Sequence, residues 1–459
     1  MDVKEVQSPV FQTGQSIESY VGDVLDESPI TNLHRRIFGL IASGYFFDIA
    51  NLVIFGTLVP TMLATGFMTK AQISIVGSAT LFGLAIGCAG QGEFTDRFGR
   101  KAVYQFNLLL FGVATVASAF APNYEVLAVL RFVAGVGLGA EQPLCFAYAG
   151  EYAPKRNRGR MLALVVFIGG ACSWPLSTLF SLTFIHIIGW RGIYGVLGGG
   201  ALIVFLLRFS LPESPRWLAT HGRGEAALMV LTRMGLHKPN PNLILTSDAA
   251  SHSTSDPIGI VFSRYPLRVI AGMVCFVAFF GVAIGLGTWL PNMMATSRGM
   301  SITKSLTYTL WIAMAYPCAS GFMMYGIERF GRKRLSMACF VLAGVAAIAF
   351  ANAPSNMLLV VAGFWMIFFV QCAGNSMQIL VSEVFPTNAR ATGFGLASGT
   401  GRLGTAFIIP TILWIQNGFG VLAVFGAVAA LVVVAASFVP LLGPEARGVA
   451  LDELAPPTG

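Results

Sequence analysis

Charged residues are scarce in this sequence. Only 11% of its 459 residues are Asp, Glu, Lys or Arg, and 55% are hydrophobic, whereas an ordinary globular domain has roughly 25% charged residues. Such a chain has too little polar surface to remain dissolved in water. The 52 glycines agree with helices embedded in lipid, where glycine is more frequent than in soluble helices. The composition therefore predicts an all-α protein that lies in a bilayer.

Cysteine pairs and catalytic motifs are also lacking. The seven cysteines are odd in number, show no CxxC spacing and fall within apolar stretches, so we expect small core residues rather than disulfides or metal ligands. The motifs HExxH, GxxxxGK[ST] and GxSxG do not occur, which removes the usual apparatus of metal, ATP and serine chemistry. We expect no enzyme, no cofactor and no metal site. The net charge of +8 is expected to lie in loops beside the membrane, so we expect no nucleic-acid partner.

Long apolar runs alternate with short charged or Pro/Gly-rich breaks along most of the chain. A bilayer core needs roughly 20 apolar residues per helix, and cutting the sequence at the breaks predicts twelve membrane spans. Their ranges are 37–63, 72–94, 102–120, 124–150, 161–185, 190–211, 268–294, 305–327, 335–352, 357–382, 391–416 and 420–442. The one long connection predicts two six-helix bundles, 34–211 and 268–443, joined by a linker over 212–267.

The positive charges are divided unequally between the two sides of the predicted spans. If the N-terminus is cytoplasmic, 23 of the 29 Lys and Arg lie on that side and four on the other. The positive-inside rule then places both termini in the cytoplasm. Residues 1–33 carry scattered acids and no apolar core, so we expect a mobile tail and no cleaved signal. Residues 444–459 are expected to form a second cytoplasmic tail, and the whole chain a multi-pass protein of the plasma (inner) membrane.

The linker contains signals for short helices. Ser214 followed by Pro215 is typical of a helix N-terminus. Residues 223–235 (RGEAALMVLTRMG) can form a short amphipathic helix, and 237–257 is rich in Pro, Asn, Ser and Asp. We therefore expect two small helices followed by a flexible segment on the cytoplasmic side.

Two motifs recur at one offset. Residues 96–101 (DRFGRK) return as 328–333 (ERFGRK), and the Glu, Pro and Arg of 151–158 return in 383–390, both after 232 residues. Each motif stands at a predicted helix end on the cytoplasmic side. Two separate motifs on one offset predict that the two bundles are parallel copies of one six-helix unit.

Five segments resemble signatures of the major facilitator superfamily. They are GEFTDRFGRK (92–101), RFVAGVGLGAE (131–141), EYAPKRNRGR (151–160), LPESPRWL (211–218) and EVFPTNARATG (383–393). Within that superfamily the chain resembles the sugar-porter-like branch, and in it the niacin and aromatic-acid proton symporters. The residues that carry this second resemblance are FFD (46–48), GAEQP (139–143), TWLP (288–291) and GRLG (401–404). The resemblance covers about 35–445 and implies two bundles around a central cavity that opens to each side in turn.

Four charged residues lie more than one helical turn from both ends of a predicted span, where each costs roughly 2.5–3.5 kcal/mol on insertion scales. They are Asp48, Arg131, Glu141 and Arg402. Asp48 shares a helix face with Tyr45 and Asn51, a setting that suits proton coupling, and permanent pairing with an arginine is the alternative. Glu141 lies ten residues after Arg131, about 15 Å along the axis and some 80° around it, so the two cannot pair directly. Glu141 therefore needs a partner from another helix or is neutral for part of the cycle. It is a second proton candidate beside a purely structural carboxyl.

Several polar and aromatic side chains are candidates for substrate binding. Arg402 can bind a carboxylate through its guanidinium fork, and a structural ion pair is the alternative. Polar residues of the tenth span recur on one face, which predicts contact with a cavity, although interhelical hydrogen bonds alone would explain two of them. The aromatic candidates suit ring stacking, and packing is the simpler interpretation of each. The candidates are Tyr45, Asn51, Arg131, Gln142, Trp174, Trp289, Asn292, Gln371, Asn375, Gln378 and Arg402.

Acids at two helix ends predict a cytoplasmic gate. Glu151 and Glu383 end their spans, where the helix dipole disfavours negative charge, so nearby arginines should compensate. The family resemblance implies that such pairs hold the cytoplasmic end shut when the cavity opens outward, and ordinary surface salt bridges worth roughly 0–1 kcal/mol are the alternative. The gate candidates are Asp96, Arg97, Arg100, Glu151, Arg158, Glu328, Arg329, Arg332, Glu383 and Arg390.

These features favour a monomeric secondary transporter that takes up a small organic anion, an aromatic or heteroaromatic carboxylate, together with protons. A sugar or polyol porter is the second candidate, although residues 281–285 (GVAIG) stand where resemblance to sugar porters implies paired glutamines. An exporter of amphipathic compounds is the third. A sensor with the same fold, which binds a ligand without moving it and signals through 212–267, is the alternative outside transport.

Overall fold

The structure is a computed structural model that describes residues 16–236, 262–385 and 390–443. The described residues form helices joined by short turns. The first half contains α1 (Ile17–Glu27), α2 (Asn32–Ala64), α3 (Lys70–Phe98), α4 (Arg100–Ser118), α5 (Tyr124–Tyr152), α6 (Arg158–Val165), η1 (Val166–Ala171), α7 (Ser173–Arg208), α8 (Pro215–Thr220) and α9 (Gly224–Arg233). We call this part the N-half.

The second half, called the C-half, begins after the part of the linker that lies outside the described residues. It contains α11 (Pro266–Phe280), η2 (Gly281–Leu286), α12 (Gly287–Ser297), α13 (Ile302–Ala313), α14 (Ala315–Phe330), α15 (Arg332–Ala351), α16 (Asn356–Glu383), α17 (Arg390–Phe438) and η3 (Val439–Leu442). The elements η1 and η2 are single π-helical stretches, a rare conformation that is frequent at functional sites.

The membrane spans follow the pattern expected from the sequence. Eight described helical stretches are long and apolar enough to cross a membrane. Two of them, Arg158–Arg208 and Gly393–Leu442, are each bent at one glycine and so contain two consecutive segments. Together with α4 and α5, these segments occupy the positions of the twelve predicted spans.

Glycines with positive φ angles repeat between the halves. Gly99 (φ 94°) separates α3 from α4, and Gly331 (φ 79°), 232 residues later, separates α14 from α15. Gly189 (φ 65°) and Gly420 (φ 82°) bend α7 and α17 at matching places. Only glycine adopts this backbone conformation without a steric penalty. The two halves therefore repeat one architecture, as the sequence repeat predicts.

Close helix packing in the N-half depends on glycines of α3 and α5. A Cβ atom on Gly139 of α5 would lie 1.9 Å from the Leu84 carbonyl oxygen of α3, and one on Gly87 of α3 would lie 2.0 Å from the Val136 carbonyl oxygen of α5. Small residues allow membrane helices to approach in this way. The glycine-rich stretch near Glu141 is therefore a packing surface for α3.

Residues 17–27 correct the expectation of a mobile tail over 1–33. They form helix α1, capped by Ser16 and buried along one side at Ile17, Tyr20, Val21 and Leu25. Apolar residues at this spacing form one face of a helix. The acids between them lower the average hydropathy of the segment, so its composition alone does not indicate a helix. A Cβ atom on Gly224 of α9 would lie 2.1 Å from Cδ1 of Ile17. The helix α1 therefore packs on the linker helices.

The linker helices themselves are confirmed. Ser214 caps α8, where its side chain accepts a hydrogen bond from the Trp217 N–H, and Pro215 is the first helical residue. The amphipathic helix α9 covers most of the range predicted for it. The segment predicted to be flexible, 237–257, and the C-terminal tail, 444–459, lie outside the described residues.

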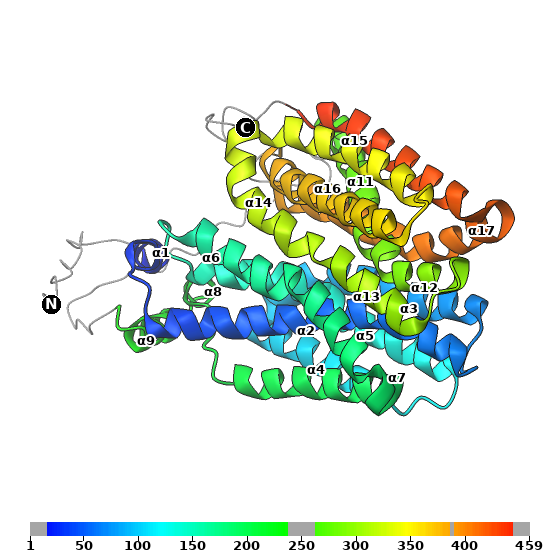
Figure 1. The fold of residues 1–459 in the computed structure, drawn as a ribbon. Coiled ribbons are helices and arrows are strands. Elements are labelled where there is room, and N and C mark those ends of the chain that lie inside the picture. Colours follow the sequence, from blue (N-terminus) through cyan, green and yellow to red (C-terminus); the bar gives the residue numbers. More distant parts are fainter. Residues whose placement is uncertain (1–15, 237–261, 386–389, 444–459) are drawn as a thin grey trace, which may run out of the picture.

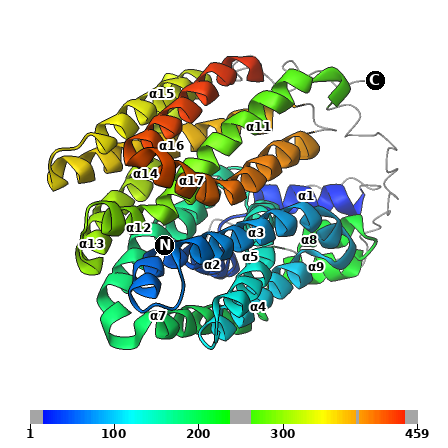
Figure 2. The same cartoon turned by 90° about the vertical axis from the view of Figure 1, so that its right-hand side faces the viewer.

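The halves lie side by side along the helix axes (Figures 1 and 2). The elements α1, α8 and α9 lie together at one end, called the α1 end, and the bends of α7 and α17 lie at the other, called the far end (Figure 1). At the far end α2 meets α12 so closely that a Cβ atom on Gly56 would lie 2.0 Å from the Thr288 carbonyl oxygen. The Ser78 hydroxyl of α3 donates to the Ala406 carbonyl of α17 at 2.9 Å. These contacts hold the two halves together at the far end.

Candidate functional site

A chain of polar contacts crosses from one half to the other. The Gln142 amide on α5 donates through Nε2 to the Tyr45 hydroxyl on α2 at 3.0 Å. Its Oε1 accepts a hydrogen bond from Nη2 of Arg402 on α17. Arg402 is 6% exposed, its guanidinium lies 5.2 Å from the centroid of the Phe280 ring, and its Nε has no partner among the described residues. The structure therefore brings together three of the predicted binding residues at the contact between the halves.

Asp48 lies one helical turn from Tyr45 and is buried, with 3% of its surface exposed. Its Oδ1 has no hydrogen-bond partner in the described part of the chain. Three charged side chains lie near enough to interact electrostatically with the Asp48 carboxyl: Glu141, Arg402 and Arg208. The carboxyl is therefore close to two arginines without being bonded to either.

Glu141 has the partner from another helix that its position requires. Its Oε1 accepts from Nη2 of Arg208 on α7 at 2.8 Å, and both side chains are fully buried. The same Nη2 donates to the Tyr104 hydroxyl at 2.8 Å. A Cβ atom on Gly44, four residues before Asp48, would lie 2.8 Å from Oε1 of Glu141 and 1.6 Å from Nη2 of Arg208. The ion pair therefore borders the face of α2 that carries Asp48.

Arg208 was missed by the sequence analysis. It lies inside the predicted span 190–211, but three residues from its end, so its charge is counted with the cytoplasmic loops. A positive charge within a turn of a span end is common in membrane proteins because the side chain can extend to the interface. The sequence signal was the unpaired Glu141, which required an arginine or lysine from another helix.

Arg131 and Asn51 lie inside the N-half. Arg131 is fully buried, and its Nη1 donates to Asn51 Oδ1 at 2.8 Å. Its Nη2 donates to the hydroxyls of Ser118 at 2.9 Å and Thr115 at 3.2 Å, and the guanidinium lies 4.7 Å from the centroid of the Tyr194 ring. All of these partners belong to α2, α4 and α7. The network therefore ties helices of one half together, and the predicted role of both residues in binding stays a prediction.

An aromatic stack forms a second contact between the halves. The rings of Trp174 on α7 and Tyr316 on α14 are parallel within 6°, with centroids 4.1 Å apart. The Tyr316 hydroxyl donates to the Ala283 carbonyl of η2 at 2.7 Å, and a Cβ atom on Gly287 would lie 2.9 Å from that hydroxyl. Tyr316 has no periodic pattern around it that would have predicted this position.

The π-helix η1 connects this stack with Tyr45. Gly169 and Gly170 of η1 face the Tyr45 ring, where added Cβ atoms would each lie 2.9 Å from a ring carbon. The Ser173 hydroxyl, next to Trp174 in the chain, donates to the Phe46 carbonyl at 3.2 Å. The aromatic stack and the chain of polar contacts are therefore neighbours.

The other predicted binding residues belong to the C-half. Trp289 and Asn292 of α12 are buried, and the Trp289 Nε1 and Asn292 Oδ1 have no hydrogen-bond partner among the described residues. On α16, the Gln371 amide donates to Asn375 Oδ1 at 3.1 Å, and Gln378 is half-buried one turn further along. These uncharged side chains can form hydrogen bonds with a substrate.

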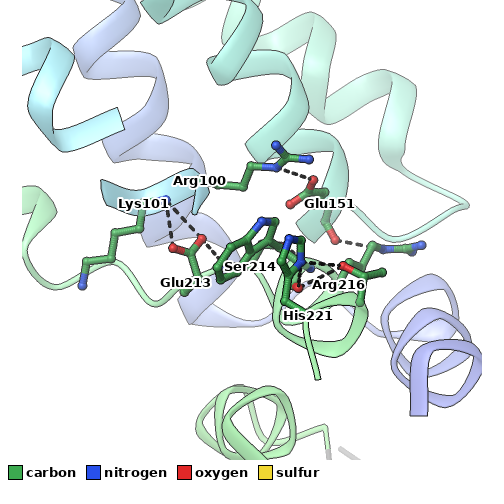
Figure 3. Close-up of polar contacts among 9 residues, drawn as sticks. Arg100, Lys101, Glu151, Glu213, Ser214, Arg216 and His221 are labelled. Carbon is green, nitrogen blue, oxygen red and sulfur yellow. Dashed lines mark hydrogen bonds and ion pairs between the residues drawn. The ribbon is translucent and has the colours of Figure 1, made fainter. Parts of the chain in front are cut away.

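The α1 end of the N-half carries a network of charged residues (Figure 3). Arg100 pairs with Glu151 through Nε at 3.1 Å, and Arg216 of α8 donates to the Glu151 carbonyl oxygen at 3.2 Å. Asp26 of α1 accepts from Arg158 at 2.9 Å and from Arg216 at 2.6 Å. The predicted gate residues Arg100, Glu151 and Arg158 thus take part in one network, and Asp26 is a member that the sequence analysis did not identify.

The gate predicted in the C-half is described only in part. The Arg329 guanidinium lies 5.9 Å from the centroid of the Phe330 ring, and the Arg332 carbonyl accepts from the Ser376 hydroxyl at 2.7 Å. The side chains of five gate candidates lie outside the described part of the chain. These are Asp96, Arg97, Glu328, Glu383 and Arg390.

The repeated halves and the buried charges where they meet define a membrane transporter of the major facilitator class. The model of the family described as "Sugar (and other) transporter" matches residues 35–456, and the chain belongs to this family. The family and the relatives are transporters and not enzymes.

The curated relatives include transporters of aromatic acids. The niacin transporter NiaP of Acinetobacter baylyi is 28% identical over 94% of this chain and 98% of its own. The 4-hydroxybenzoate transporter PcaK of the same organism is 28% identical over 84% of this chain and 85% of its own. Among solved structures, a partially occluded inward open conformation of the xylose transporter XylE from Escherichia coli has a TM-score of 0.75 with 19% identity, covering 92% of this chain and all of that one. This last similarity shows the fold alone.

Proposed function

We propose that the protein is a proton-coupled transporter that takes up a small aromatic or heteroaromatic carboxylate by alternating access. One observation carries this proposal: Arg402 is a buried cation whose Nε has no partner among the described residues, and it donates to Gln142 of the opposite half, which is bonded to Tyr45. A guanidinium binds a carboxylate through two parallel hydrogen bonds. In this structure the Arg402 guanidinium is hydrogen-bonded to Gln142, and a substrate carboxylate would replace Gln142.

The ring of the substrate would stack near Trp174. The parallel arrangement of Trp174 and Tyr316 is the geometry that an aromatic ring adopts on another ring. When the halves separate, Trp174 and Tyr316 no longer stack on each other, and a flat substrate ring can take the place of either. The named substrates of the relatives, niacin and 4-hydroxybenzoate, are of this chemical type.

The proton would be carried by a buried carboxyl near Arg402. Asp48 and Glu141 are the two candidates, and both lie next to arginines. A carboxyl that is neutral while the loaded site crosses the membrane and ionised while the empty site returns carries one proton with each substrate. We further propose that both termini face the cytoplasm, that the charge network around Glu151 acts as the cytoplasmic gate, and that a monomer is the working unit.

Uptake into proteoliposomes tests this function. Purified protein is reconstituted and supplied with labelled nicotinate under an inside-alkaline pH gradient. We expect accumulation that a protonophore abolishes. Arg402→Gln should weaken half-saturation by about 10- to 100-fold, because a charged hydrogen bond is worth about 1.5–3 kcal/mol, and the exposed Arg264→Gln is the matched control. A protein that binds nicotinate without accumulating it would be a sensor, and accumulation without a proton gradient would reject coupling.

Sugar transport is the second candidate. The family description and the fold of the xylose transporter are compatible with it, and the amides Asn292, Gln371 and Asn375 are neutral groups suited to hydroxyls. A sugar substrate gives Arg402 no carboxylate to bind. Competition therefore separates the two: unlabelled xylose should not inhibit nicotinate uptake, and 4-hydroxybenzoate should.

A further inference from the structure

We propose that Arg208 is the permanent counter-ion of Glu141, which leaves Asp48 as the one carboxyl of the buried site that takes up and releases a proton. From the sequence alone, Asp48 and Glu141 are both candidates for carrying the proton. The assignment of Asp48 rests on the proton coupling proposed above, whereas the pairing of Glu141 with Arg208 does not. Arg208 thus keeps Glu141 in its charged form.

The Arg208 guanidinium is fixed on several sides. Besides its bonds to Glu141 and Tyr104, its Nε donates to the Leu40 carbonyl of α2 at 3.2 Å. Its Cζ lies 3.8 Å from the centroid of the Tyr104 ring, and Nη1 is the only nitrogen without a partner among the described residues. The partners Leu40, Tyr104 and Glu141 all belong to the N-half. When the halves move relative to each other, the pair keeps its surroundings.

The ion pair opposes protonation of Glu141. Both side chains are fully buried, and an isolated buried cation is strongly unfavourable, so removing one member of such a pair destabilises a protein far more than removing both. Protonating Glu141 would have the same effect on Arg208 as removing it. Glu141 Oε2 also has no hydrogen-bond partner in the described structure, so the charge of Arg208 is what stabilises this carboxylate.

Asp48 has no such partner among the described residues. Its Oδ1 is buried and has no hydrogen bond in that part of the chain, and a buried carboxylate without hydrogen bonds is best accommodated as the neutral acid. The titratable and charged groups facing Asp48 are Tyr45, Glu141, Cys145, Arg208 and Arg402. Of these, the Arg208 charge is neutralised by Glu141. Arg402, from the opposite half, is the charge that changes its distance to Asp48 when the halves move.

This arrangement gives a simple proton balance. One proton from the solution binds the Asp48 carboxylate when the site opens to one side, and the same proton leaves to the solution on the other side. One proton is therefore moved in each cycle, and Glu141 keeps its charge throughout.

Thermal stability tests the pairing without any substrate. Glu141→Gln copies a protonated glutamate, so it should lower the Tm by about 5–10 °C if Arg208 needs the charge, and Arg208→Met should do the same. The double variant should regain most of the loss. Glu125→Gln, which removes an exposed acid from the same helix, is the control. The Tm difference between wild type and Glu141→Gln should stay constant from pH 5 to pH 8, and a difference that vanishes at low pH would show that Glu141 titrates.

Transport of nicotinate tests the assignment of Asp48. Asp48→Asn should lose accumulation driven by a proton gradient and keep counterflow, the exchange of labelled for unlabelled nicotinate. In the double variant Glu141→Gln/Arg208→Met, the ratio of proton-driven accumulation to counterflow should equal that of wild type, whatever the absolute rate of the variant. A double variant that exchanges nicotinate but cannot accumulate it would overturn the assignment. If wild type itself does not accumulate nicotinate, the proposed coupling and the role of Asp48 fail together, and the Tm series still decides the pairing.

Discussion

Arg131, Arg208 and Arg402 are all buried, and each is stabilised differently. Arg131 is surrounded by neutral oxygens, Arg208 is paired with a carboxylate, and Arg402 donates to an amide of the opposite half. The partners of the first two belong to the N-half, as these arginines do. The partner of Arg402 belongs to the other half, because Gln142 lies on α5. Arg402 is therefore the buried cation whose hydrogen bond crosses between the halves.

The approach of α2 to the Arg208–Glu141 pair depends on Gly44. We expect Gly44→Ala to lower the free energy of unfolding by about 1–3 kcal/mol, because the added methyl group would lie 1.6 Å from Nη2 of Arg208 and must displace it. Thermal unfolding in detergent measures the change. The control is Gly39→Ala in the same helix, where nothing lies within 4 Å of the added carbon. Equal Tm values for both variants would mean that the pair can relax freely.

At the scale of elements, the segment before α8 supports the start of α4. Glu213 accepts hydrogen bonds from the backbone N–H groups of Lys101, at 3.1 Å, and Ser214, at 3.0 Å (Figure 3). Gly99 precedes α4 with a positive φ angle, and a Cβ atom there would lie 2.6 Å from Oε2 of Glu213. A carboxylate at the N-terminus of a helix satisfies unpaired N–H groups and opposes the positive end of the dipole. The linker and the N-half are joined at this point.

Glu213 should make stability depend on pH. Burial raises its pKa above that of an exposed glutamate, and the N–H groups of Ser214 and Lys101 partly oppose this. A folded-state pKa above the unfolded value of about 4.3 means that the folded protein binds the proton more tightly than the unfolded chain. The contribution of Glu213 to the free energy of unfolding is therefore fully present below the unfolded pKa and falls as pH rises through the folded-state pKa. We therefore expect the Tm of wild type relative to Glu213→Gln to fall between pH 4 and pH 7. Glu225→Gln, at an exposed position of α9, should show no such trend; a trend of the opposite sign would contradict the prediction.

Much of the fold could be predicted because its signals are local. Apolar runs and one repeated offset give the spans and the two halves without any knowledge of contacts. The site required more than that. Glu141 predicts a partner but does not identify Arg208, since the two are far apart in the sequence, and Tyr316 has no polar or aromatic stripe around it. The helix α1 was not predicted because the segment was judged by its composition, and its acids outweigh the few apolar residues of one face.

At the scale of the molecule, the described contacts bear on the alternating access proposed above. The hydrogen bonds and close approaches near Gly56 and Ser78 join the halves at the far end, and the polar contacts of Arg402 lie deeper between them. Glu151 and Asp26, in contrast, are bonded within the N-half at the α1 end. Opening the far end therefore requires α2 to leave α12.

The tight approach at Gly56 makes this step testable. Gly56→Leu should prevent α2 from reaching α12, because even a methyl group would lie 2.0 Å from the Thr288 carbonyl, and so favour the state in which the α1 end is closed. In a cysteine-free background, spin labels at the exposed positions Arg36 and Arg329 report the distance between the halves at the α1 end. We expect Gly56→Leu to shift that distance to shorter values and to reduce nicotinate uptake at least tenfold, while Gly39→Leu, in open surroundings on the same helix, leaves both unchanged. An unchanged distance distribution in Gly56→Leu would mean that the halves do not pivot about the far end.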